Sequence, residues 1–174
     1  MDTDGVMQLV AILILVLLSG FFSSAETSLT TANRVRLKAL ADEGSKRAQT
    51  ALDVLEKYGK MLSAILIGNN IVNIVASSLA TTLALKIGLA VGIATGILTV
   101  VILLFGEIIP KNVAMVYSEK MALFYASIIS GLMKIMTPVI FLIDKLAGVL
   151  MKLLHIDAGK RTAMTETELR TYVE

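Results

Sequence analysis

Hydrophobic residues gather in three long runs that polar stretches separate. The runs extend from Val6 to about Leu29, from about Met61 to Leu85, and from Gly88 to about Val116. Each is longer than the roughly 20 residues that an α-helix needs to cross a bilayer. The pattern therefore predicts an all-α integral membrane protein with three transmembrane helices.

The stretch between the first and second runs, residues 33–60, is polar. It carries seven basic and four acidic residues. Apolar residues recur in it at helical spacing, and Gly44 divides them into two groups, so we expect a short helical hairpin outside the membrane. Only Lys86 and Ile87 join the second run to the third, and so short a link predicts antiparallel neighbours.

The distribution of basic residues sets the expected orientation, because loops rich in lysine and arginine stay in the cytoplasm. No basic residue precedes the first run, whereas the hairpin carries seven. We therefore predict a multi-pass protein of the inner cell membrane, with its N-terminus outside and its hairpin and C-terminus in the cytoplasm. Asp2 and Asp4 stand where a signal peptide has basic residues, so we expect the first run to be retained.

The chain after Val116 is apolar again, but charged residues and Pro138 interrupt it. We expect amphipathic juxtamembrane helices over residues 118–155, hinged at Pro138 and lying along the inner membrane surface. A fourth span is the alternative. Residues 156–174 read as the start of a linker to cytoplasmic domains, so the expected organisation is a three-span core over residues 1–117 followed by these two segments.

Composition agrees with a membrane protein and excludes several other classes. Hydrophobic residues make up 56% of the chain, charged residues 17%, and the mean hydropathy is +0.79, which is too apolar for a soluble domain of this size. The absence of cysteine excludes disulfides, thiolate nucleophiles and soft-metal sites. Basic residues are scattered without interleaved aromatic residues, so we expect no nucleic-acid partner. No H-E-x-x-H or paired aspartates are present, so we expect no enzyme.

One carboxylate, Glu107, lies in an otherwise uncharged apolar stretch that runs from Ile87 to Pro110. An ionised side chain at membrane depth is costly and by default indicates ion or proton handling. Pro110 has no backbone N–H, so it is expected to free the carbonyl of Gly106 four positions earlier, and such a carbonyl is tolerated where it lines a cavity or binds an ion. The alternative is a surface pair between Glu107 and Lys111, one turn later.

The first two runs supply neutral oxygen atoms. Ser19 and Ser23 share one helix face, and Asn69 and Asn73 share another. A carboxylate among hydroxyl and amide oxygens suits a hard cation. The alternatives are serines bonded to their own helix and asparagines that join two spans. The candidate ligands and ligand supports are Ser19, Ser23, Gly68, Asn69, Asn70, Asn73 and Glu107, with Glu26 as a second-tier candidate.

Small residues recur every four positions on two runs. The sets are Ala76, Ala80 and Ala84, and Gly88, Gly92 and Gly96. Such stripes predict close packing between helices, within one protomer or between two.

Three motifs stand in order along the chain. They are S-G-F-F-S-S-A-E-T-S-L-T-T from Ser19, G-N-N-I-V-N from Gly68, and G-E-I-I-P-K from Gly106. Over nearly the whole chain, this ordered set resembles the transmembrane module of the CorC/CNNM magnesium transporters. By motif position, the resemblance implies that Ser23, Asn69, Asn73 and Glu107 are Mg²⁺ ligands or their supports, followed by Ser19, Gly68 and Asn70.

The resemblance also implies an assembly and an activity. These are a homodimer with three spans per protomer and a Mg²⁺ site that faces the cytoplasm, with Mg²⁺ efflux driven by Na⁺ entry. Family members continue into cytoplasmic CBS domains that this sequence does not contain. The alternative function is a membrane-embedded Mg²⁺ sensor or anchor that binds the ion without moving it.

Overall fold

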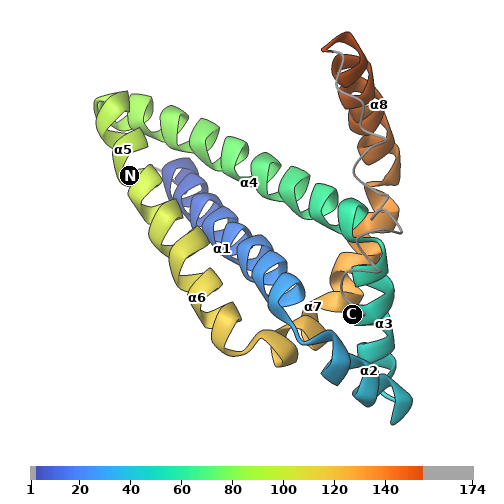
Figure 1. Ribbon diagram of the computed structural model, residues 1–174. Coiled ribbons are helices and arrows are strands. Elements are labelled where there is room, and N and C mark those ends of the chain that lie inside the picture. Colours follow the sequence, from blue (N-terminus) through green and yellow to red (C-terminus); the bar gives the residue numbers. More distant parts are fainter. Residues whose placement is uncertain (1–2, 155–174) are drawn as a thin grey trace. The chain divides into compact units, whose positions relative to one another are not determined.

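The computed structural model describes residues 3–154, and its regular structure in this range is helical (Figure 1). The predicted linker over residues 156–174 lies outside the described residues. The elements are α1 (Thr3–Thr31), α2 (Arg34–Asp42), α3 (Lys46–Glu56), α4 (Tyr58–Ile87), α5 (Val91–Val101), the π-helix η1 (Ile102–Ile108), α6 (Ile109–Val116), α7 (Ser118–Ile135) and α8 (Thr137–Leu153).

Three helical segments are long and apolar enough to cross a membrane, as the hydrophobic runs predicted. They are α1, α4 and the continuous segment α5–η1–α6, which covers Val91–Val116. Helices α7 and α8 meet the same criteria only if they are counted together as one broken span. The prediction of three spans is confirmed among the described residues.

Helix α1 lies between α4 and the η1–α6 segment (Figure 1). It runs antiparallel to α4, because Asp4 near its start forms an ion pair of 3.5 Å with Lys86 near the end of α4. Further along both helices, Ser19 donates a hydrogen bond of 2.9 Å to Asn69. The two contacts keep nearly the same antiparallel register.

The interface of α1 with its neighbours has two chemically different parts. The first, here called the apolar seam, consists of Ile12, Val16, Ala76, Ala80 and Leu98. The second, here called the polar seam, begins one turn later on α1 and consists of the buried residues Ser19, Ser23, Ser24, Thr27 and Ser28. The polar seam is where the first sequence motif lies.

Gly88 ends α4 at the turn to α5, whereas we expected it to belong to a helix-packing stripe. Gly88 has φ = 71°, a left-handed conformation that favours glycine, and the N–H of Leu89 donates to the Ala84 carbonyl at 2.9 Å. This is the usual way in which a glycine ends a helix. The alanine stripe on α4 packs as predicted, whereas a Cβ added to Gly92 or Gly96 would meet no atom within 4 Å in the described chain.

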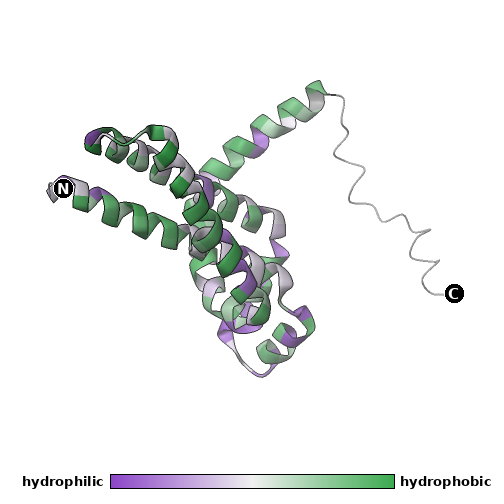
Figure 2. Ribbon diagram, turned by 90° about the vertical axis from the view of Figure 1, so that its left-hand side faces the viewer, coloured by the Kyte–Doolittle hydropathy of each residue, from purple (hydrophilic) through white to green (hydrophobic). Residues whose placement is uncertain are grey.

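The hairpin between the first two spans consists of α2 and α3. Asn33 caps α2 by accepting from Val35 N at 3.0 Å, and Ser45 caps α3 by accepting from Ala48 N at 3.3 Å. Between the helices Gly44 has φ = 94°, which suits a tight turn. Figure 2 shows hydrophobic residues along the N-terminal part of α1. Hydrophilic residues are concentrated around α2 and α3. The predicted helices are present, and their cytoplasmic location stays a prediction.

The described chain separates into two compact units, of which the first ends at Met136 and the second begins at Thr137. Helix α7 therefore belongs with the spans, although we expected a boundary after residue 117. The reason is packing: one face of α7 is buried against α1, α3 and α4. Pro138, the predicted hinge, lies in the first turn of α8, and the break between α7 and α8 is at Met136. Whether these helices lie along a membrane surface stays a prediction.

Candidate cation site

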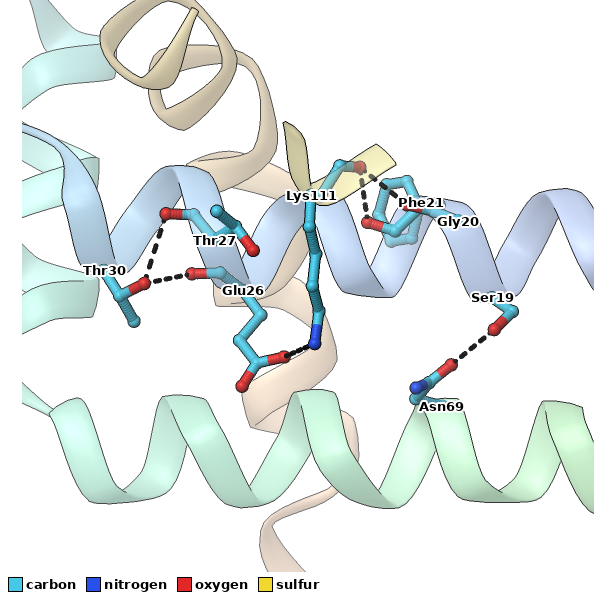
Figure 3. Close-up of polar contacts among 9 residues, drawn as sticks. Ser19, Gly20, Phe21, Glu26, Thr27, Thr30, Asn69 and Lys111 are labelled. Atoms are coloured by element: carbon cyan, nitrogen blue, oxygen red, sulfur yellow. Dashed lines mark hydrogen bonds and ion pairs between the residues drawn. The ribbon is translucent and has the colours of Figure 1, made fainter. Parts of the chain in front are cut away.

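The sequence motifs meet first at Ser19 and Asn69. Ser19 is fully buried on α1, and its Oγ donates to Asn69 Oδ1 at 2.9 Å (Figure 3). This contact shows that the first two motifs lie against each other. It also agrees with the alternative that asparagines join two spans, because one amide oxygen is used in an interhelical hydrogen bond.

Three glycines allow the segments to approach this closely. A Cβ on Gly68 would lie 2.6 Å from Phe22 Cζ, and one on Gly106 would lie 3.0 Å from Ser19 Oγ. A Cβ on Gly20 would lie 3.0 Å from the Phe105 carbonyl oxygen. Glycine is therefore the residue that brings α4 and η1 up to the polar face of α1.

Two buried oxygen atoms near this contact have no hydrogen-bond partner in the described part of the chain. They are Ser23 Oγ and Asn73 Oδ1. Because α1 and α4 are antiparallel, Ser23 lies one turn to one side of the Ser19–Asn69 bond and Asn73 lies one turn to the other. A buried polar atom left unpaired costs about 1–3 kcal/mol. A ligand that pairs with either oxygen would remove this cost.

Asn70 differs from the other two asparagines because it is exposed, whereas Asn69 and Asn73 are partly buried. It contributes to an open groove of about 370 Å³ along one side of α4, which is lined by Asn70, Asn73, Ile74, Ser77, Ser78 and Thr81. Asn73 thus stands between the interface with α1 and this groove. The predicted asparagine cluster is therefore divided between two faces.

Glu107 lies on η1, one residue after Gly106 and its contact with Ser19. Its side chain is half-buried, and among residues 3–154 no hydrogen bond or ion pair joins it to a partner. π-Helical turns inside α-helices are rare, and those that occur are often at functional sites. The backbone thus brings Glu107 to the same level as Ser19 and leaves its carboxylate without a protein partner.

The π-helical register changes which carbonyl Pro110 leaves without a donor. We expected this to be Gly106, four residues earlier, but Ile109 N donates to the Leu104 carbonyl, five residues earlier. In that register the missing N–H of Pro110 would have paired with Phe105. The Phe105 carbonyl packs against Gly20, so the freed carbonyl faces the α1 backbone.

Lys111 pairs with Glu26 on α1, with Nζ and Oε2 3.8 Å apart (Figure 3). The alternative of a surface pair between Lys111 and Glu107 is therefore not formed. The Lys111 side chain is 42% exposed and that of Glu26 is 28% exposed, so water screens the attraction and the pair contributes little to stability. The second-tier candidate Glu26 is accounted for by this ion pair.

Ser24 takes part in a connection that the sequence did not indicate. Its hydroxyl lies 2.8 Å from that of Tyr125 on α7, and it donates to the Gly20 carbonyl at 2.7 Å. The bond to Gly20 is the local one that serines in membrane helices commonly make. Tyr125 could not be found from the spacing of the motifs, because it lies in a segment that we expected outside the three-span core.

The donor set suits a hard cation and carries little charge. Within residues 3–154, no three histidine, cysteine, aspartate or glutamate side chains come together. Glu107, next to Gly106 on η1, is the candidate residue that carries a charge, and the other candidates offer neutral oxygen atoms. Carboxylate, hydroxyl and amide oxygens are the ligand types that hard cations prefer.

Comparison with known proteins gives one family match. The family model described as the Cyclin M transmembrane N-terminal domain matches residues 10–174. A UPF0053 protein of Haemophilus influenzae is 42% identical over 178 residues, which cover 99% of this chain and 42% of that protein. The UPF0053 inner membrane protein YfjD of Escherichia coli is 36% identical over 160 residues, which cover 90% of this chain and 37% of YfjD.

More distant relatives carry a functional name. The polyamine export protein of Escherichia coli strain K12 is 30% identical over 182 residues, which cover 96% of this chain and 41% of that protein. This chain therefore spans about two fifths of the length of the curated relatives that it matches.

Proposed function

This chain belongs to the family of the Cyclin M transmembrane N-terminal domain, the CorC/CNNM family that its three motifs predicted, and from this premise we propose that it carries Mg²⁺ across a membrane. The proposal includes export from the cytoplasm, Na⁺ entry as the driving reaction, and a homodimer as the working unit. Its apolar helices and its likeness to an inner membrane protein support a membrane location.

The observation that carries the proposal is the pair of unpartnered buried oxygens, Ser23 Oγ and Asn73 Oδ1. They flank the bond between Ser19 and Asn69, and Glu107 lies on the adjacent segment. A folded chain gains nothing from burying polar atoms without partners. A bound cation would satisfy them, and Glu107 would supply the negative charge.

The spacing of these oxygens favours an ion that keeps part of its water. Ser23 and Asn73 lie two helical turns apart along the seam, which is about 11 Å. Mg²⁺ holds its ligands at about 2.1 Å and gives up water reluctantly, so one ion cannot contact both oxygens directly. Bridging waters would let the ion interact with both, and Glu107 on the adjacent segment would supply the negative charge.

A polyamine is the second candidate substrate, because relatives with 29–31% identity are named polyamine export proteins. An elongated polycation would place its amines along several oxygens and would not need octahedral geometry. The polar groove on α4, which includes Asn70 and Asn73, is the feature that would suit it. The Ser19–Asn69 contact and Glu107 on the adjacent segment are the features that would suit a small ion.

The test is transport by the purified protein in sealed vesicles. A Mg²⁺-sensitive dye reports ion movement with and without a Na⁺ gradient, and labelled spermidine reports polyamine movement in parallel. Glu107→Gln should lower Mg²⁺ transport about ten-fold or more, because it removes the charge that compensates the ion. Asp144→Asn, an exposed carboxylate on α8, is the control and should transport normally.

A matched pair of asparagines tests the position of the site. Asn69→Ala should reduce Mg²⁺ transport strongly, whereas Asn70→Ala should have a small effect, because Asn69 bonds Ser19 and Asn70 is exposed. Full Mg²⁺ transport by Glu107→Gln would contradict the proposed site. Mg²⁺ binding without transport would favour the sensor or anchor, and movement of spermidine alone would favour the second candidate. Equal Mg²⁺ movement with and without a Na⁺ gradient would exclude Na⁺ coupling.

A further inference from the structure

A second polar pocket lies where α3, the start of α4 and α7 meet. It has a volume of about 240 Å³ and is lined by Asp53, Val54, Lys57, Lys60, Ser130, Met133 and Lys134. All of these residues belong to the compact unit that ends at Met136. The pocket is separate from the Ser19–Asn69 contact and shares no residue with the candidate cation site.

The pocket carries an excess of positive charge. Three ammonium groups line it, and the one carboxylate among its lining residues, Asp53, accepts a hydrogen bond of 2.9 Å from Gln49 Nε2. The ion pairs of the described chain involve Arg36, Lys86 and Lys111 and leave these three lysines unpaired. Like charges held close together repel one another, so an anion bound among them would lower the electrostatic energy.

The backbone adds to this preference for an anion. Helix α4 begins at Tyr58, next to Lys57 and Lys60, and no side chain caps its N-terminus. The free N–H groups and the dipole of a helix N-terminus favour negative charge. Ser130 adds a hydroxyl donor from the opposite wall of the pocket.

The position of the pocket along the chain indicates which anion it meets. Helix α4 is a 30-residue candidate span, so its first turn lies where a span enters the membrane surface. Tyr58, which is 43% exposed there, is the kind of residue that gathers at the level of lipid headgroups. Basic pockets beside transmembrane helices at this level bind anionic headgroups.

We propose that Lys57, Lys60, Ser130 and Lys134 form a binding site for the phosphate of an anionic phospholipid. A lipid held there contacts α3, α4 and α7 at once. It thereby joins the hairpin to the first turn of a span and to the helix whose Tyr125 contacts Ser24. This inference is independent of the ion that the protein transports.

The experiment is native mass spectrometry of the purified protein released from membranes of phosphatidylglycerol mixed with phosphatidylcholine. The triple variant Lys57→Gln, Lys60→Gln and Lys134→Gln should retain about 100-fold less phosphatidylglycerol, since each lysine near a headgroup is worth roughly a five-fold change in affinity. The control is Lys46→Gln, Arg47→Gln and Lys120→Gln, which removes the same charge from exposed positions outside the pocket. It should change retention less than about two-fold.

Two further arms keep the result decisive. Lys134→Gln alone changes one exposed side chain and should lower retention about five-fold, which covers the case in which the triple variant does not fold. Inorganic phosphate is titrated into protein held in phosphatidylcholine alone. Equal lipid loss in the pocket and control variants would overturn the site, and binding of inorganic phosphate that the triple variant abolishes would overturn the assignment to a lipid.

Discussion

The apolar and polar seams are formed along the same face of α1 and in the same antiparallel register. They differ in whether unpaired polar atoms remain in the interface. In the apolar seam, Ile12 and Val16 fill the space above Ala76 and Ala80 and leave no polar atom there. In the polar seam, glycines bring the neighbouring segments closer still, but hydroxyl and amide oxygens remain and two are unpaired. Close packing alone therefore does not decide whether an interface is closed or can accept a ligand.

The comparison bears directly on transport. A cation in the polar seam meets oxygen atoms, whereas the apolar seam beside it offers none, and an ion among apolar side chains is very costly. Beyond the apolar seam the Gln8 Oε1 atom is again buried without a partner in the described chain. In the transport that we propose, the apolar seam is thus the barrier that must open for an ion to pass along α1.

The largest effect on stability is expected from shortening a side chain that fills the apolar seam. Ile12→Ala should lower the free energy of unfolding by about 2 kcal/mol or more, because it leaves a cavity in a packed interface. Mg²⁺ affinity should stay within about two-fold, because no ligand oxygen is lost. Unfolding in mixed micelles and Mg²⁺ titration measure the two quantities. Ile14→Ala is the control, since Ile14 is 52% exposed and Ile12 is 7% exposed.

A comparable loss is expected from separating α1 from the third span. Gly20→Ala puts a Cβ 3.0 Å from the Phe105 carbonyl oxygen and 3.1 Å from Pro110 Cγ, and a backbone atom and a rigid ring yield little. We expect a loss of about 1–3 kcal/mol in stability together with weaker Mg²⁺ binding.

The control for this change is Gly96→Ala, where the added Cβ meets no described atom within 4 Å. It should leave the stability equal or slightly higher, because alanine favours the helix. A Gly20→Ala protein as stable as the parent would show that the close approach of α1 and η1 is not needed.

Ser23→Ala should affect stability and binding in opposite directions. Without Mg²⁺ the variant should be equal to or about 1 kcal/mol more stable than the parent, because a buried unpaired hydroxyl is removed. With Mg²⁺ its affinity should be lower. Thermal unfolding at increasing Mg²⁺ concentration measures both, since a ligand stabilises the state that binds it.

Ser24→Ala gives the contrast within the same seam. Its hydroxyl is already bonded to Tyr125 and to the Gly20 carbonyl, so the change should destabilise the protein modestly with and without Mg²⁺. A Ser23→Ala variant that loses stability without Mg²⁺ would indicate that Ser23 has a partner after all.

The smallest effect is expected at the exposed edge of the polar seam. Glu26→Gln should change stability by less than about 1 kcal/mol, because the ion pair with Lys111 is partly exposed and screened. Mg²⁺ transport should stay within about two-fold of the parent. Transport assays and unfolding at low and high salt test this, and loss of transport comparable to that of Glu107→Gln would return Glu26 to the candidate site.

Several features of the site could be predicted from local sequence, and others could not. Ser19 and Asn69 were candidates taken from the motifs, and the structure joins them by a hydrogen bond, with Gly106 of the third motif packed against Ser19. Pro110 indicated an interruption of the helical hydrogen bonds, but the π-helical register was not predictable. A proline specifies a missing donor and not the type of turn that accommodates it. The partner of Lys111 was also missed. Glu26 lies far away in sequence and comes close to Lys111 only because α1 packs against α6.

The sequence by itself determined the spans, the hairpin and the family. Run length, charge distribution and short motifs are properties of neighbouring residues, and the bilayer imposes its requirement on each helix separately. Only the tertiary structure decided which oxygens are bonded and which stay available. That outcome depends on the register of α1 against α4 and on the turn at Glu107, and both are set by side chains that meet from distant parts of the chain.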